Sequence, residues 1–301
     1  MRHKYITSLF VTVLASLLLC SCWREDLSQC WKGDVILSIT AERFGELPDK
    51  PAASDLGATV SDFQYYLFNK NGNIADQGSV DVSSVHDDHY DLIIPTLPFG
   101  EYTLALTANT GGALMNAETW QAIRLECPET SGTDYFTSLY TFTLDCECGY
   151  ADIVKLYRSK GIVDVRLEEL PSVISRARVD ISPVSAYCLP DTTYEGSKAV
   201  WAETLVTSEN GTTPVTLSLD AFPNVEETLA TVTLTLYMSG SNGGEIIAAQ
   251  RELTQKLQIV RNQRMGISVN FNNSITSVPG VTITLNPDWD GINGDTDIDI
   301  N

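Results

Sequence analysis

Residues 62–73 read DFQYYLFNKNGN, and their pattern of apolar and polar residues decides the fold class. Phe63, Tyr65 and Leu67 alternate with the residues between them, which is the two-residue period of a strand that buries one face. The stretch ends in NKNGN, a composition that favours the tight turn of a β-hairpin. It therefore predicts a strand that leads into a hairpin.

The same alternation recurs along the chain and is rich in Thr, Val, Ile and Tyr, which suit a half-buried pleated surface. Helical periodicity is scarce, and only residues 114–123 favour a short helix. Strands with one buried and one solvent-exposed face are typical of antiparallel sandwiches, so we predict an all-β protein. The further alternating runs are residues 102–108, 140–144, 231–236, 265–271 and 281–285.

A boundary between two sets of strands is predicted near Gly149, where Cys-Glu-Cys-Gly interrupts the pattern. The second set is expected to begin with strands at 153–157 and 162–167. Each part has the size of one sandwich of about seven strands, as in immunoglobulin-like domains. We therefore expect two tandem β-sandwich domains, at 34–149 and at 150–301, the second ending in an acidic tail.

The N-terminal residues have the form of a bacterial lipoprotein signal. A basic start (Arg2, Lys4) precedes an apolar run over residues 9–19, which is shorter than the roughly 20 residues that span a bilayer. Ser21 precedes Cys22, whereas the bulkier Leu19 precedes Cys20. We predict that residues 1–21 are removed, that Cys22 receives the lipid (acyl chains such as palmitate), and that residues 22–33 form a tether.

The charge of the chain excludes some partners. It carries 39 Asp+Glu against 19 Lys+Arg, a net charge of −20, and loss of Arg2 and Lys4 with the signal makes it two units more negative. Such a surface repels phosphate backbones and anionic headgroups, so nucleic acid is not an expected partner. Attachment to a membrane must then come from acyl chains.

Five cysteines follow the lipid cysteine and are possible disulfide cysteines in an exported protein. Their number is odd, so at least one thiol stays free or pairs elsewhere. Cys146 and Cys148 are expected to pair with Cys127 or Cys188, or with each other, and Cys30 is placed to tie the tether to the first domain. The pairing stays open among Cys30, Cys127, Cys146, Cys148 and Cys188.

Two acidic clusters raise the question of a metal. His86 and His89 flank two aspartates, but in a strand they face opposite ways, so the segment is predicted to be a polar hairpin tip. The run at 288–299 is rich in Asp yet lacks the order of a calcium loop. We expect no metal and no cofactor.

No catalytic motif is visible. The chain shows no nucleophile elbow, no phosphate-binding glycine loop and no His-paired serine. We therefore predict that it is not an enzyme.

Several stretches resemble one family, the fimbrial anchor and minor subunit lipoproteins of type V pili of Bacteroidetes. These are the segment from Cys22 to Cys30, the strand and turn at 62–72, and the Pro-Phe-Gly turn at 98–100 that leads into Tyr102. The resemblance implies two tandem transthyretin-like sandwiches, attachment to the outer membrane, no catalysis and a role in anchoring a pilus. Residues 24–26 (Arg-Glu-Asp) are similar to the export signature of lipoproteins that face the medium.

The predicted function follows from the resemblance. The chain is expected to be a cell-surface lipoprotein that acts as a fimbrial anchor or assembly subunit and binds pilin by strand addition. The alternative is a surface glycan-binding lipoprotein of a polysaccharide-uptake system. That alternative needs exposed aromatic side chains, for which Trp120, Trp201 and Trp289 are the candidates.

Overall fold

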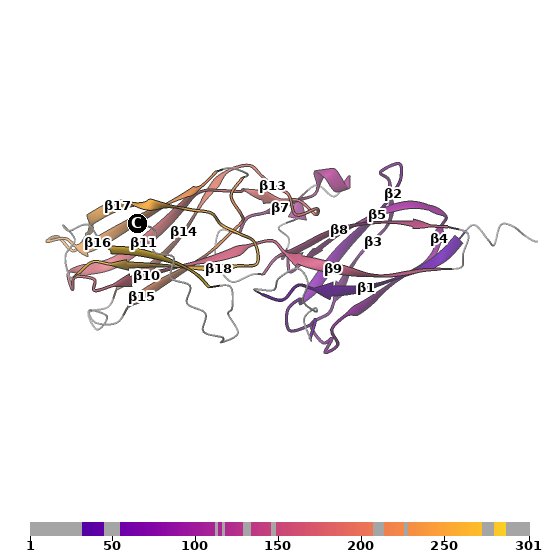
Figure 1. Cartoon of the computed structure of the whole chain (residues 1–301), viewed down its shortest axis with the longest axis horizontal. Helices are drawn as coiled ribbons and strands as arrows, with labels where there is room; N and C mark the ends of the chain where they lie inside the picture. The colour runs from indigo at the N-terminus through magenta and orange to yellow at the C-terminus, as the bar shows by residue number, and fades with distance from the viewer. Residues whose placement is uncertain are drawn as a thin grey trace, which may run out of the picture.

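The computed structural model describes residues 32–44, 55–111, 114–115, 118–128, 134–145, 149–206, 214–225, 228–272 and 280–286. Within these ranges most residues lie in strands, and there is no α-helix. The all-β prediction is therefore confirmed. Figure 1 shows long strands in two halves that lie end to end.

The first half contains β1 (Lys32–Ala41), β2 (Asp62–Asn69), β3 (Ile74–Asp81), β4 (Tyr90–Pro98), β5 (Gly100–Ala108), β8 (Phe136–Leu144) and β9 (Tyr150–Arg158). These strands form one seven-stranded sheet in the order β3-β2-β5-β8-β9-β1-β4. The sheet curls round a core to which nearly every strand contributes. In β1, for example, Val35, Leu37 and Ile39 are fully buried, while Asp34 and Ile36 between them are exposed.

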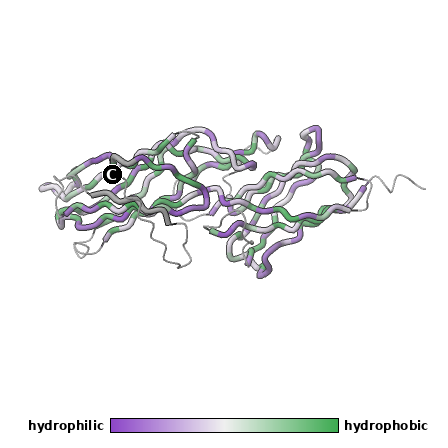
Figure 2. Tube along the Cα trace, viewed as in Figure 1, coloured by the Kyte–Doolittle hydropathy of each residue, from purple (hydrophilic) through white to green (hydrophobic). Residues whose placement is uncertain are grey.

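The second half contains two four-stranded sheets. One has the order β15-β10-β18-β19 and the other the order β14-β11-β16-β17, and they share one core. Alternating hydrophobic and hydrophilic residues along these strands are visible in Figure 2. The strands are β10 (Gly161–Glu168), β11 (Ile174–Val184), β14 (Lys198–Leu205), β15 (Val215–Ala221), β16 (Ala230–Ser239), β17 (Glu245–Leu257), β18 (Arg264–Asn270) and β19 (Gly280–Asn286).

A small fourth sheet connects the halves. It has the order β13-β12-β7-β6 and combines β6 (Leu114–Met115) and β7 (Arg124–Glu126) with β12 (Tyr187–Cys188) and β13 (Tyr194–Glu195). Leu125 on β7 is therefore buried in the second core although it lies among first-half residues in the sequence.

Two sequence expectations need correction. The helix expected at 114–123 is wrong, because the described part of this segment holds β6 and a single 3₁₀ turn, η2 (Trp120–Ala122). The strand expected at 153–157 does not begin the second set. It is part of β9, which pairs with β1 and β8 in the first sheet. Pairing with β1, more than 100 residues earlier, cannot be read from local periodicity.

Candidate functional site

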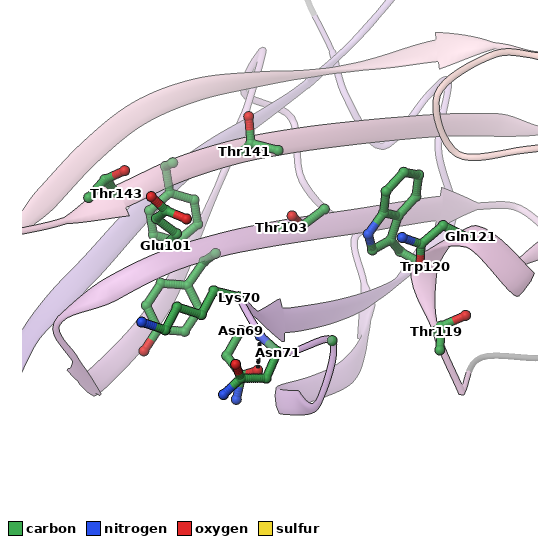
Figure 3. Close-up of a pocket in the computed structure, with 13 residues that line it drawn as sticks. Asn69, Lys70, Asn71, Glu101, Thr103, Thr119, Trp120, Gln121, Thr141 and Thr143 are labelled. Carbon is green, nitrogen blue, oxygen red and sulfur yellow. Dashed lines mark hydrogen bonds between the residues drawn. The ribbon is translucent and has the colours of Figure 1, made fainter.

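A polar groove lies on the outer face of the first sheet, over β5 and β8. It has a volume of about 650 Å³ and extends from the turn after β2 to the η2 turn. Figure 3 shows Trp120 at one end and Lys70, Glu101 and Thr143 toward the other. This places one of the three candidate tryptophans in a groove, half-buried.

The first strand is held on both sides. β1 pairs with β4 in antiparallel fashion and with β9 in parallel fashion, the latter over seven residue pairs from Val35↔Tyr150 to Ala41↔Leu156. The Asp34 carboxylate also accepts the Thr96 backbone N–H at 2.9 Å. Because β1 comes directly after the predicted tether, this pairing joins the tether to the sheet.

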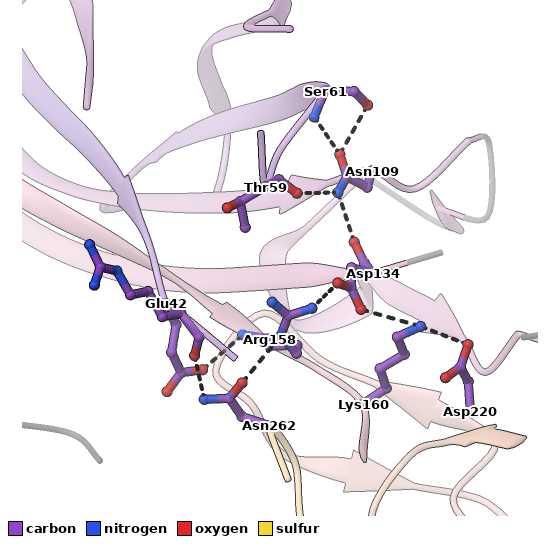
Figure 4. Close-up of polar contacts among 10 residues, drawn as sticks. Glu42, Thr59, Ser61, Asn109, Asp134, Arg158, Lys160, Asp220 and Asn262 are labelled. Atoms are coloured by element: carbon purple, nitrogen blue, oxygen red, sulfur yellow. Dashed lines mark hydrogen bonds and ion pairs between the residues drawn. The ribbon is translucent and has the colours of Figure 1, made fainter. Parts of the chain in front are cut away.

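At the end of β1 the chain enters a cluster of charged and polar side chains, most of them buried, which we call the junction cluster; Asp134 and Arg261 are partly exposed. It consists of Glu42, Asp134, Arg158, Lys160, Asp220, Arg261 and Asn262. These residues come from the ends of β1, β9 and β15, from the segment before β8, and from the β17–β18 connection. The cluster lies where the two halves meet, and Figure 4 labels all of its members except Arg261.

Glu42 begins the cluster and is only 2% exposed. Its Oε2 accepts the backbone N–H of Arg158 at 3.0 Å and Nη1 of Arg261 at 2.7 Å. One carboxylate therefore joins the end of β1 to β9 and to the β17–β18 connection of the second half.

Arg158 is 3% exposed and ends β9. Its guanidinium forms an ion pair with Asp134, and its Nε donates to Oδ1 of Asn262 at 3.1 Å. The charged group also lies about 5 Å from the ring centroids of Phe44 (5.0 Å) and Phe136 (4.9 Å), within the range of cation–π attraction.

Lys160 is 2% exposed and stands between two carboxylates. Its Nζ lies 2.7 Å from Asp220 and 3.3 Å from Asp134, as Figure 4 shows. Burial alone would raise the pKa of Asp134, but the charges of Arg158 and Lys160 hold that pKa below its ordinary value.

The junction cluster is balanced, with three carboxylates against three cationic side chains that contact one another. Removing one member of a buried pair leaves an uncompensated charge, which is strongly destabilising. The arrangement therefore acts as a joint that fixes one half against the other. Sequence reasoning missed it, because each member stands alone in the sequence and only the pairing of distant strands brings them together.

Most predicted lipid and disulfide positions lie outside the described residues, namely Cys22, Cys30, Cys146 and Cys148. Cys127 and Cys188 are described and are free thiols in the second core. The pairings expected through these two residues are therefore not observed. Burial raises the pKa of both thiols to about 11, so both are protonated near neutral pH.

The two histidines of the predicted hairpin tip contact different partners. Nδ1 of His86 lies 3.5 Å from Asp55, and Nδ1 of His89 lies 2.7 Å from Asp88. In the part of the chain that the structure describes, no three His, Cys, Asp or Glu side chains gather as metal ligands do. The acidic run at 288–299 lies outside that part.

The other tryptophan candidates differ from Trp120. Trp201 is 45% exposed on β14, and the guanidinium of Arg178 lies 4.5 Å from its ring centroid. Trp289 lies outside the described residues. No described helix is long and apolar enough to cross a bilayer.

The fold is all-β, with two halves joined at the junction cluster. A profile of the fimbrillin-A associated anchor proteins Mfa1 and Mfa2 matches residues 47–293. The chain therefore belongs to this family of fimbrial anchor proteins, which confirms the resemblance seen in the sequence.

Solved structures share the fold. The fimbrial anchor protein Mfa2 from Porphyromonas gingivalis superposes with a TM-score of 0.58 at 15% identity, covering 85% of this chain and 98% of that one. A candidate polysaccharide-binding protein from Bacteroides thetaiotaomicron gives a TM-score of 0.59 at 12% identity, covering 85% and 96%. A candidate adhesin from Bacteroides ovatus gives 0.57 at 9%, covering 88% and 94%. No curated protein sequence matches the chain.

Proposed function

We propose that this protein is a lipid-anchored subunit that holds fimbriae at the outer membrane, on the side that faces the medium. In this proposal residues 1–21 are the signal, Cys22 carries the acyl chains and residues 22–33 are the tether. The two cores belong to tandem transthyretin-like sandwiches, and β9 is a strand of the first sandwich. Membership of the fimbrial anchor family supports the role.

The observation that carries the proposal is the parallel pairing of β1 with β9. A force on the fimbria would reach β1 at its start, through the tether to the membrane. It would reach β9 at its end, through the second half, because only Ser159 and Lys160 separate β9 from β10. The two strands run in the same direction, so opposed pulls load the ladder in shear and strain its hydrogen bonds together. Each bond contributes only about 1 kcal/mol net, but in shear they resist as a group.

Strand addition by pilin needs an open edge, and β9 offers one. On the side away from β1, β9 pairs with β8 at only two positions, Phe136↔Arg158 and Thr137↔Tyr157. Among the described strands, Tyr150–Leu156 therefore has a ladder on one side only. Unpaired edges of this kind accept an extended segment through main-chain hydrogen bonds.

A similar arrangement of strands in the second half supports strand addition at this edge. There β10 lies between an antiparallel neighbour, β15, and a parallel one, β18, as β1 lies between β4 and β9. The remaining edge of β18 is paired with β19 over seven residues. In the first half a pilin segment would occupy the equivalent position beside β9, displacing the contact between the Tyr140 and Tyr150 hydroxyls, which are 2.7 Å apart.

Substitution of the two neighbouring cysteines tests the membrane part of the proposal. Cells producing Cys22→Ala should lose incorporation of a labelled fatty acid into the chain and should release fimbriae into the medium. Cys20→Ala is the matched control and should keep the label and the fimbriae. Labelled protein or retained fimbriae in the Cys22→Ala cells would overturn the proposal.

A further inference from the structure

The floor of the groove, beside Trp120, is a row of polar side chains on two paired strands. Thr103 pairs directly with Thr141, and Glu101 pairs with Thr143. Directly opposed residues in an antiparallel pair have Cβ atoms about 5 Å apart. All four side chains face away from the core, because the residues that alternate with them are buried, for example Tyr102 and Phe142.

An apolar cluster on the same face of the sheet borders the groove at one end. After Thr103 and Thr141, the next opposed pair on the same face of these two strands is Ala105 and Leu139. Trp120 packs over this pair together with Phe68 and Ile123. The indole is thus seated on the sheet at the end of the polar row. It stands beside Thr103 and Thr141 in Figure 3.

The turn that carries Trp120 is fixed in place. Nη1 of Arg124 donates to the carbonyl oxygen of Gln121 at 2.6 Å, and the same guanidinium forms an ion pair with Glu195 of β13. The indole is therefore ordered before any ligand arrives, which lowers the entropic cost of binding.

The opposite wall is the turn after β2, which is also ordered. Oδ1 of Asn69 accepts the backbone N–H groups of Asn71 at 2.9 Å and Asn73 at 3.2 Å. Lys70 extends from this turn over the groove. A second hollow of about 380 Å³ adjoins it and shares Lys70 and Glu101, so the groove is long enough for an extended ligand.

Five polar side chains of the groove have no partner among the residues that the structure describes. No hydrogen bond or ion pair to another described residue is made by the side chains of Lys70, Glu101, Thr103, Thr141 or Thr143. The groove thus offers hydroxyl, carboxylate and ammonium groups to a ligand.

We propose that this groove binds a neutral oligosaccharide. A sugar ring has an apolar face, which an indole covers, and a rim of hydroxyl groups, which threonine, glutamate and lysine can hydrogen-bond. One lysine and one glutamate leave the groove without net charge, so it does not select an ion. The volume lies within the range of roughly 300–1,000 Å³ that is typical of ligand sites.

A peptide fits less well. β5 is hydrogen-bonded to β2 and to β8 through the floor of the groove, so this strand has no free backbone edge with which an extended peptide could pair. The carbohydrate proposal is also independent of the anchor role, since the groove does not include β1, β9 or the junction cluster.

The test is a screen of the mature protein against arrayed neutral oligosaccharides, followed by calorimetry with the best binder. Trp120→Ala and Thr143→Val should each weaken binding at least tenfold, while Trp201→Ala, the matched control on β14, should leave it unchanged. Thr143 is exposed, so its variant stays decisive if loss of Trp120 unfolds the protein. Fimbriae should stay on cells carrying either groove variant.

Three outcomes would overturn the proposal. In the first, the protein binds no oligosaccharide on the array. In the second, both groove variants bind the oligosaccharide as well as the wild type does. In the third, the protein binds only to peptides, tested on a second array.

Discussion

The carboxylate of Glu42 accepts the backbone N–H of Arg158 at 3.0 Å, although 116 residues separate the two in the sequence. The contact lies at the ends of the paired strands β1 and β9, and both residues are almost fully buried. It extends the ladder between these strands by one charge-assisted bond, a stronger kind than a bond between neutral groups. The strand that follows the proposed tether is thereby fastened to the strand that leads into the second half.

Removal of this carboxylate should destabilise the protein strongly. Glu42→Ala leaves a buried N–H of Arg158 unpaired and takes the carboxylate from Arg261, so we expect a loss of about 3 kcal/mol in the free energy of unfolding, measured by urea denaturation. Glu252→Ala is the control, because its pair with Lys256 is exposed and should contribute less than about 1 kcal/mol. Equal effects of the two substitutions would contradict the role of Glu42.

The start of β10 should tolerate no side chain. A Cβ at Gly161 would overlap the carbonyl oxygen of Val260 and lie 3.3 Å from that of Gln263, whereas a Cβ at Gly244 would meet nothing within 4 Å. Gly161→Ala should therefore lower the free energy of unfolding by about 1–3 kcal/mol, and Gly244→Ala should change it little. Thermal unfolding of both variants checks the prediction, which fails if Gly161→Ala is as stable as the wild type.

Acid should weaken the junction cluster. The pKa of Asp134 is lower in the folded protein than its ordinary value, because the charges of Arg158 and Lys160 outweigh the effect of burial. A lowered pKa in the folded state gives stability that is present above the unfolded value of about 4 and is lost as the pH falls through the folded value. Urea unfolding between pH 6 and pH 3 should therefore show a smaller loss for Asp134→Asn than for the wild type. Parallel curves would contradict this.

The two core thiols should be unreactive in the folded protein. Cys127 and Cys188 are free, buried and have pKa values raised to about 11 by burial, so the thiolate that reacts is scarce. Peptide mapping after iodoacetamide treatment at pH 7.5 should find both unmodified in the native protein and both modified in urea. Rapid labelling of either residue without denaturant would contradict the structure.

The strands could be predicted from sequence where local periodicity decides them. The alternation over 62–73 predicts β2 and its turn, and both are present. At 114–123 local preference misleads, because pairing of β6 with β7 overrides the helical tendency of the segment. The position of β9 was missed because a parallel partner always lies far away in sequence.

The candidate site was predictable only in part. Trp120 was singled out as an aromatic residue that could contact a ligand, and it lines the groove. The threonines beside it carried no signal, since they alternate in the sequence like those of any strand. The junction cluster gave none either, because up to 219 residues separate its partners, as with Glu42 and Arg261.

Photo-crosslinking on living cells tests the central claim most directly. A photoreactive amino acid replaces Asp152, on the open edge of β9, or Glu203 on β14 as the control. After irradiation the protein is purified from the outer membrane and its adducts are identified by mass spectrometry. We predict adducts with a fimbrial subunit from position 152 and none from position 203. Purified protein that carries no fimbrial subunit from either position would contradict the account.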